Sequence, residues 1–345
     1  MRRAITLVLA SAFLFSNSFA FADVQYTEES KITGGAATGA MKMAGIFSKD
    51  ARQAMQGSTT TVSVKGNKMR HESSLGTAQI FDLDGRRVID IDMKHKTYSV
   101  MTFEQMKEQV AEAKRKAAEE QAKRSGKKGE DTKVTIKPKI SIEPGAGSKE
   151  ILNYNAKETK IRVDMEMEAQ DSKGNNQSGN TWVNSDNYVA PVKGYDEVKR
   201  FYAKMAKELD WVPGAMMQNN ANLQINQPMV EYNKNLEKLN GMPLLSYVSV
   251  GMGPNPGTTG QNAAPTPEKK EGNAITKGLG GMMGGFGKHK QKDSSDDDSA
   301  KAASAQGGSL MDMTTTVTSF SNSAVDAGLF EIPAGFKQVE KKEQK

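Results

Sequence analysis

Alternation of apolar and polar residues is the main pattern in the chain, and it predicts strands. Its first occurrence covers four segments, residues 59–69, 79–84, 89–93 and 97–101. Asp84 and Gly85 separate the second segment from the third, and an Asp-Gly pair is typical of a tight hairpin turn. The four segments therefore predict an antiparallel meander with one buried face.

Six more segments have strand-like patterns: residues 134–142, 151–154, 160–168, 181–188, 244–250 and 311–320. Pro138 cannot donate to a strand ladder, so its segment reads as an edge strand or a bulged one. The last two segments could pair with each other across the intervening residues, which would then form a long hairpin insertion. Such an insertion is tolerable because loop-closure entropy grows only logarithmically with length.

Helix signals are fewer. Residues 102–105 have the form of a capping box, and the helix that they predict continues to Ala117. A clearer helix covers residues 196–209, where apolar residues recur at helical spacing. A third is predicted from Pro228 to Leu239, and a weaker one over residues 36–55. The apolar strand faces need a cover and the helix over 196–209 supplies one, so the patterning predicts an α+β fold.

The N-terminus has the pattern of a secretory signal peptide. Arg2 and Arg3 precede a twelve-residue apolar run over residues 4–15, and Ala20 and Ala22 are the small residues of a cleavage site. As a helix the run would span about 18 Å, short of the ~30 Å hydrocarbon core, which disfavours a membrane anchor. We therefore predict a leader over residues 1–22, cleavage near Ala22, and a soluble protein exported to the periplasm or beyond.

Composition divides the rest of the chain. Only 37% of the residues are hydrophobic, and the polar ones concentrate in two stretches that cannot bury enough apolar area to offset ordering entropy. The prediction is a main domain over residues 23–252 with a flexible charged stretch at 115–133, and a disordered, low-complexity insertion at 253–309. Residues 310–345 are predicted to form the C-terminal strands of the same domain and a charged tail.

Cysteine usage and charge exclude several classes of protein. The absence of cysteine rules out disulfides, cysteine-based zinc sites and a thiol nucleophile. The formal net charge of +6 becomes +4 without the leader. Residues 114–139 hold ten basic and four acidic residues, which suits either a solvated linker or a weak contact with an anionic membrane surface. Export argues against a nucleic-acid partner.

Two groups of side chains could bind metal. Three methionine pairs have one residue between their members: Met41 and Met43, Met165 and Met167, Met311 and Met313. Thioethers bind Cu(I), and His71 or His95 could add a ligand, but residues two apart on a strand also share a face and fill a core. Four aspartates, Asp82, Asp84, Asp90 and Asp92, straddle the hairpin and are expected on one solvated face rather than around calcium. We expect no metal and no cofactor.

Catalytic signatures are missing from the sequence. With three histidines and no cysteine few triads are possible, and neither a Gly-x-Ser-x-Gly nor a His-Glu-x-x-His motif occurs. The glycine run over residues 278–288 does not fit a phosphate loop, since Met282 and His289 stand where that motif requires glycine and Ser or Thr. A protein without enzymatic activity and without catalytic residues is therefore expected.

The order of several motifs resembles a known family. They lie at residues 64–72, 96–98, 151–154, 182, 194–202 and 330–337. Together they resemble an uncharacterised family of exported bacterial domains similar to the outer-membrane lipoprotein carrier and receptor superfamily, over most of residues 31–339. The resemblance implies a strongly curved antiparallel sheet, a half-open β-barrel, with helices covering its concave face. Relatives of known role bind acyl chains or lipidated partners in that space.

Two functions follow as hypotheses. The first is a soluble periplasmic binding protein that holds a lipid, an acyl chain or a lipidated partner between the curved sheet and its helices. Its candidate pocket lining is Phe81, Leu83, Ile89, Ile91, Met93, Ile161, Val163, Met165, Met167, Phe201 and Met205. The second is an envelope structural or protein-interaction module with a dry core, whose insertion at 253–309 contacts a partner protein. A metal-binding envelope protein is a third, weaker alternative.

Overall fold

A computed structural model describes residues 23–36, 38, 56–126, 133–170, 176–209, 231–232, 235–236, 238–256 and 308–340. Several predicted features lie outside these residues: the leader, Met41 and Met43, nearly all of the weak helix over 36–55, and residues 257–307 of the predicted insertion. The helix predicted from Pro228 to Leu239 is described only in part.

Twelve strands form one open sheet. They are β1 Val24–Gly34, β2 Ser58–Lys65, β3 Lys68–Ser73, β4 Thr77–Asp82, β5 Arg87–Asp92, β6 Thr97–Thr102, β7 Lys133–Ile151, β8 Tyr154–Gln170, β9 Asn176–Ala190, β10 Met242–Met252, β11 Ser309–Ser321 and β12 Lys337–Gln338. Their order is β12-β6-β5-β4-β3-β2-β1-β11-β10-β9-β8-β7. All neighbours are antiparallel except β12, which runs parallel to β6, so the large strand content expected from the sequence is confirmed.

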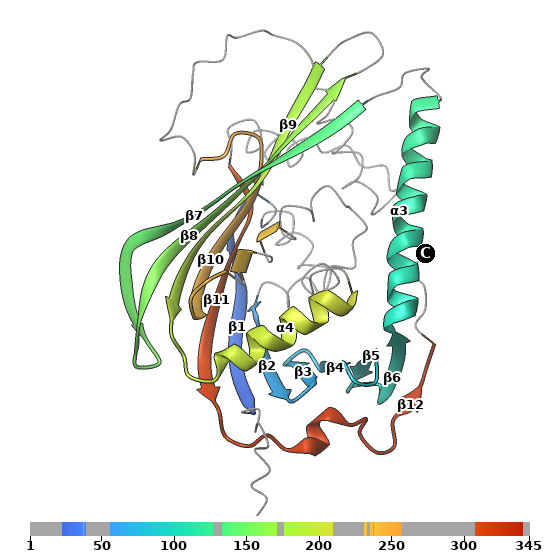
Figure 1. The fold of residues 1–345 in the computed structure, drawn as a ribbon, viewed down its shortest axis with the longest axis vertical. Coiled ribbons are helices and arrows are strands. Elements are labelled where there is room, and N and C mark those ends of the chain that lie inside the picture. The colour runs from blue at the N-terminus through green and yellow to red at the C-terminus, as the bar shows by residue number, and fades with distance from the viewer. Residues whose placement is uncertain are drawn as a thin grey trace, which may run out of the picture.

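Two meanders build this sheet and meet at a seam between β1 and β11 (Figure 1). β1 to β6 follow one another in space as in sequence, and so do β7 to β10. β11 pairs with β10 from Leu245 opposite Thr316 to Gly251 opposite Ser309, which confirms the pairing proposed across the insertion. β7 is the last strand on its side, as Pro138 predicted for an edge.

One helix packs on a face of the sheet. Helix α4 (Tyr195–Leu209) buries Val198, Phe201, Met205 and Leu209, as the apolar stripe predicted. These side chains join one core cluster with residues of β1 to β6, β10 and β11. Figure 1 shows the sheet bending around α4. We call this side of the sheet the α4 face.

The second helix touches the sheet only near its start. Helix α3 (Phe103–Gly126) buries Phe103 and Met106 in the same cluster. Its capping box is confirmed: Gln105 N donates to Thr102 Oγ1 at 3.1 Å, and Thr102 N donates to Gln105 Oε1 at 2.8 Å. Its helical residues reach Gly126, inside the stretch expected to be flexible. Of the two helices described in full, α4 lies on the sheet and α3 contacts it near its start, so a cover made of several helices is not confirmed among the described residues.

The opposite face of β4 to β6 carries a second apolar cluster. Ala78, Ile80, Ile89 and Ile91 are buried there, and Ile332 and Phe336 from the C-terminal segment pack on them. This segment includes the 3-10 helix η2 (Ala327–Phe330) and ends in β12. Arg70 Nη1 donates to the Leu329 carbonyl at 3.0 Å and ties the segment to β3. Packed apolar side chains therefore lie on both faces of β4 to β6.

The long strands have a third cluster. Ile161, Val163 and Met165 on β8 pack with residues of β9 and β10 and with Tyr232 and Leu239.

On β10, Gly251 lies opposite Trp182, and a Cβ at this position would come within 2.2 Å of the indole ring. Glycine is therefore required here for the buried tryptophan to lie flat on the strand.

Candidate functional site

Cross-strand register arranges the α4 face of β1 to β6 in three parallel rows of side chains. The apolar row is Val24, Val64, Met69, Phe81, Val88 and Met101. The mixed row is Tyr26, Val62, His71, Gln79, Asp90 and Ser99. The hydroxyl row is Glu28, Thr60, Ser73, Thr77, Asp92 and Thr97. Residues two apart on a strand share a face, so each strand supplies one member to every row.

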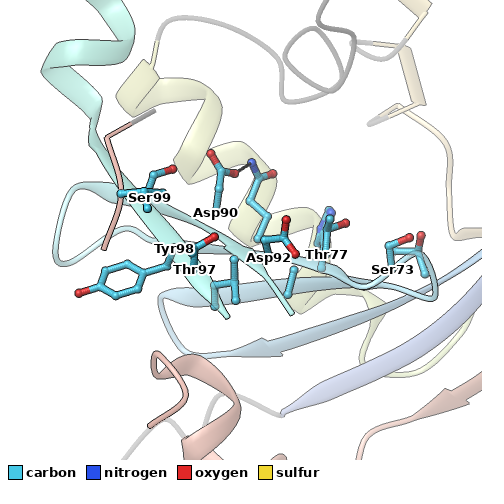
Figure 2. A pocket seen from close by; sticks show the side chains of 13 residues that line it. Ser73, Thr77, Asp90, Asp92, Thr97, Tyr98 and Ser99 are labelled. Carbon is cyan, nitrogen blue, oxygen red and sulfur yellow. Dashed lines mark hydrogen bonds between the residues drawn. The ribbon is translucent and has the colours of Figure 1, made fainter. Parts of the chain in front are cut away.

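A pocket of about 490 Å³ lies over the mixed and hydroxyl rows. Its lining takes four residues from the mixed row and five from the hydroxyl row: His71, Gln79, Asp90, Ser99, Thr60, Ser73, Thr77, Asp92 and Thr97. Ala78, Ile91, Tyr98 and Val339 complete the lining. In Figure 2 the side chains of Asp90, Asp92 and Ser99 rise from one side of the strands, whereas Tyr98 points away from them.

Both carboxylates of the pocket are held by hydrogen bonds. Gln79 Nε2 donates to Asp90 Oδ1 at 2.6 Å, a bond drawn in Figure 2. Asp92 accepts from the backbone N–H groups of Lys94 and His95, both at 2.9 Å, and from His95 Nδ1 at 2.6 Å. The bond from the His95 side chain holds the pKa of Asp92 below its ordinary value. Asp92 is therefore ionised at neutral pH.

A chain of polar groups runs from the pocket under α4. The Tyr202 hydroxyl lies 3.2 Å from His71 Nε2 and also bonds with Tyr26. Burial lowers the pKa of His71 to about 4, so its imidazole is neutral at pH 7. Burial also raises the pKa of Glu28, which neighbours Tyr26 in strand β1, to about 7. Burial thus favours the uncharged forms of both Glu28 and His71.

The residues predicted to line one apolar pocket fall into three separate clusters. Phe81 and Leu83 meet Phe201 and Met205 under α4. Ile89, Ile91 and Met93 lie on the opposite face with the C-terminal segment. Ile161, Val163 and Met165 lie in the cluster of the long strands. Met167 is described only in its backbone, which pairs with Ile136 and Gly179. Ile91 alone of these residues borders the described pocket.

The four aspartates of the hairpin do not share a face, contrary to the expectation from the sequence. Phe81 pairs with Val88, and Asp82 pairs with Arg87. Asp82 thus lies with Ile80 on the opposite face, where its Oδ2 accepts from Arg87 Nε at 3.2 Å. Asp90 and Asp92 instead belong to the pocket rows. In the described part of the chain no three His, Asp or Glu side chains gather as a metal site would require.

Buried polar groups elsewhere bond with one another. Tyr232 donates to Asn187 Oδ1 at 3.3 Å and lies 3.0 Å from Ser185 Oγ, while Ser246 donates to the same Asn187 oxygen at 2.8 Å. On the other face of β8 and β9, Asp164 accepts from Asn255 and Asn180 at 2.9 and 3.2 Å. These bonds satisfy buried groups within the sheet, which is a structural role.

Sequence reasoning did not single out Glu28, Tyr26, Gln79 or Ser99. Tyr26 and Glu28 lie in β1, which the sequence patterns did not predict as a strand, and Gln79 and Ser99 lie in predicted strands whose polar residues resemble an ordinary solvated face. Only the alignment of several strands shows that they form continuous rows, and a single sequence holds no direct signal for that alignment. His71 was noted only as a possible metal ligand.

Comparisons with known proteins do not identify the chain: no family model, no curated protein and no solved structure matches it. Among the described residues, no helix combines the length and the apolar character that crossing a membrane requires. The pocket and its rows are therefore the features from which a function is inferred.

Proposed function

We propose that this chain is a binding protein without enzymatic activity that holds a small polar molecule over β2 to β6. The observation that carries the proposal is the pocket of about 490 Å³ lined by hydroxyl, amide and carboxylate groups of two adjacent rows. A sheet face used only for packing would continue the apolar row. Binding sites instead combine a concave shape with a few polar groups in fixed positions, and strands hold these groups rigidly.

Export is part of the proposal. The positive N-terminus, the apolar run over residues 4–15 and the small residues at Ala20 and Ala22 support a cleaved leader. The protein would then act in the periplasm or outside the cell. N-terminal sequencing of the protein secreted by its host tests this part, and a chain that begins at Asp23 is the expected result.

Equilibrium dialysis tests the binding function. The folded protein is dialysed against a small-molecule extract, and the retained compounds are identified by mass spectrometry. We expect a polar compound that the wild type enriches and that the double variant Thr60→Val, Thr77→Val does not. Thr318→Val, on β11 and outside the pocket lining, is the matched control and should retain it. Absence of enrichment, or equal enrichment by the double variant, would contradict the proposal.

A second candidate, an apolar ligand as first expected from the sequence, has one observation in its favour. Ile140 and Ile142 on edge strand β7 are exposed at 39% and 38%. They pair with the buried Val163 and Ile161, so they extend the apolar face of the long strands. Organic extraction of the purified protein followed by mass spectrometry tests this candidate. Protein that yields no lipid, and that takes up no fluorescent fatty acid, would exclude it.

A further inference from the structure

Among the described lining residues of the pocket, the charged groups have one sign. Among its lining residues Asp90 and Asp92 are the acids, and the lining holds neither lysine nor arginine. His71, the remaining basic group, stays neutral because burial lowers its pKa to about 4. An anionic ligand would therefore meet two carboxylates and neither lysine nor arginine among the described lining residues, which is unfavourable in a half-enclosed site.

Glu28 is another acidic residue on the same face of the sheet, outside the described pocket lining. It begins the hydroxyl row, and its cross-strand neighbour Thr60 lines the pocket. Its carboxyl group forms neither a hydrogen bond nor an ion pair with any described residue, and burial alone raises its pKa to about 7. Four strand steps of roughly 4.8 Å each separate Glu28 from Asp92, so Glu28 adds an acidic group to the row but does not contact a ligand held by Asp92.

We infer that the ligand of this pocket is an organic cation that carries ammonium groups, with Asp90 and Asp92 as its anionic partners. The inference rests on the proposed function and specifies its ligand class. Asp90 and Asp92 are two residues apart on β5, which places them about 6.8 Å apart along the strand. That spacing is comparable with an extended four-carbon diamine.

Both carboxylates can accept a further donor. Asp90 accepts a bond from Gln79 at 2.6 Å, and Asp92 accepts three bonds, from His95 Nδ1 at 2.6 Å and from the backbone N–H groups of Lys94 and His95 at 2.9 Å. An ionised carboxylate has about four lone-pair sites, so an ammonium group can join these bonds without replacing them. Ser99 and Thr97, opposite Asp90 and Asp92 on β6, supply hydroxyl acceptors beside the same positions.

Three probes of equal length separate charge from shape. The full exported chain is titrated calorimetrically at low salt and pH 7.5 with 1,4-diaminobutane, 1,4-butanediol and succinate. We expect heat of binding from the diamine and none from the diol or the diacid. Asp90→Asn and Asp92→Asn should each weaken diamine binding about 10-fold or more, as expected for a hydrogen bond to a charged group. Glu331→Gln, an exposed acid outside the pocket lining, is the control of equal charge change and should bind as the wild type does.

Two further controls distinguish specific binding from misfolding and from nonspecific electrostatic attraction. Thermal unfolding of each one checks that it is folded, and Thr77→Val provides a pocket variant that alters no charge. If the diol binds as tightly as the diamine and Thr77→Val abolishes both, the pocket function stands and the cation inference is wrong. Equal diamine binding by the wild type and both aspartate variants would also overturn it, since the attraction would be a general surface effect.

The dialysis experiment separates the remaining outcomes. A pocket-dependent cation recovered there supports the inference even if the small diamine binds too weakly for calorimetry. A pocket-dependent anion or neutral compound overturns the inference and leaves the binding function intact. If neither experiment finds a pocket-dependent ligand, the inference and the proposed function fall together.

Discussion

The apolar row and the hydroxyl row run parallel to each other across the same six strands, yet they serve different purposes. The apolar row is buried throughout and packs under α4. The hydroxyl row, four positions away from the apolar row on each strand, leaves Thr77 exposed and lines a pocket. The mixed row between them changes from Tyr26 and Val62 to Asp90 and Ser99. A distance of four residues along each strand thus separates stability from binding on one continuous surface.

Removing an apolar contact between α4 and the apolar row should have the largest effect on the stability of the protein. Phe201 is 2% exposed and packs with the apolar row, so Phe201→Ala should lower the free energy of unfolding by about 3–5 kcal/mol. Urea denaturation followed by circular dichroism measures the change. A loss below about 1 kcal/mol would show that the apolar row does not hold α4.

The stability of the protein should depend on pH through one group in each of two rows, His71 in the mixed row and Glu28 in the hydroxyl row, and their effects have opposite signs. Folding raises the pKa of Glu28 from 4.5 to about 7, so its contribution to stability is complete below pH 4.5 and is lost as the pH rises through 7. Folding lowers the pKa of His71 from 6.5 to about 4, so its contribution is complete above pH 6.5 and is lost as the pH falls through 4. Between pH 4.5 and 6.5 the two slopes oppose each other.

Glu28→Gln should expose the slope that His71 alone produces. In this variant the free energy of unfolding should rise with pH between 4.5 and 6.5 by up to about 1.4 kcal/mol per unit. At pH 8 the variant should be more stable than the wild type by up to about 3 kcal/mol, because an ionised buried carboxyl group has been removed. Urea unfolding at pH 4.5, 5.5, 6.5 and 8 measures both effects. Parallel curves for variant and wild type would refute this account of Glu28.

A smaller substitution distinguishes the two faces of β5. Ile89 is 3% exposed on the face opposite the pocket, so Ile89→Val should lower the free energy of unfolding by about 0.5–1.5 kcal/mol. Binding of the dialysis ligand should not change. If affinity falls while stability is preserved, Ile89 lines a binding site, as the sequence analysis expected.

The smallest effect on stability is expected in the hydroxyl row. Thr77 is exposed, so Thr77→Val should change the free energy of unfolding by no more than about 0.5 kcal/mol. The same change removes a hydroxyl group from the pocket and should reduce ligand retention in dialysis. A large loss of stability without a binding effect would assign this row to the fold rather than to the site.

Local signals in the sequence predicted several elements correctly. The capping box at Thr102, the apolar stripe of α4 and the edge position of Pro138 all depend on residues close together in the chain. The pairing of β10 with β11 was proposed from the order of two strand patterns along the chain, and the residues between them form a long connection. The other features are local ones. Such features are set by local backbone chemistry, which a single sequence records directly.

The arrangement of faces could not be predicted in the same way. β4 and β5 each carry apolar residues on both faces, so alternation alone does not decide which residues meet. The turn from Leu83 to Arg86 sets the register, with Arg86 at a φ of 49°, and pairs Ile80 with Ile89 rather than Phe81 with Ile89. A one-residue difference in register moves every side chain to the other face. The predicted apolar pocket therefore divided into separate clusters.

The seam between β1 and β11 determines when the sheet can be completed. Thr27 and Thr318, whose backbone and side chain are bonded across it, are 291 positions apart. β2 to β6 can form hairpins as soon as they leave the ribosome, and so can β7 to β10, because their partners are close in sequence. β1 obtains its second neighbour only when nearly the whole chain has been made, and contacts of such long range form slowly. Until then one edge of β1 is open to pairing with another chain, which makes this N-terminal strand the place where folding competes with aggregation.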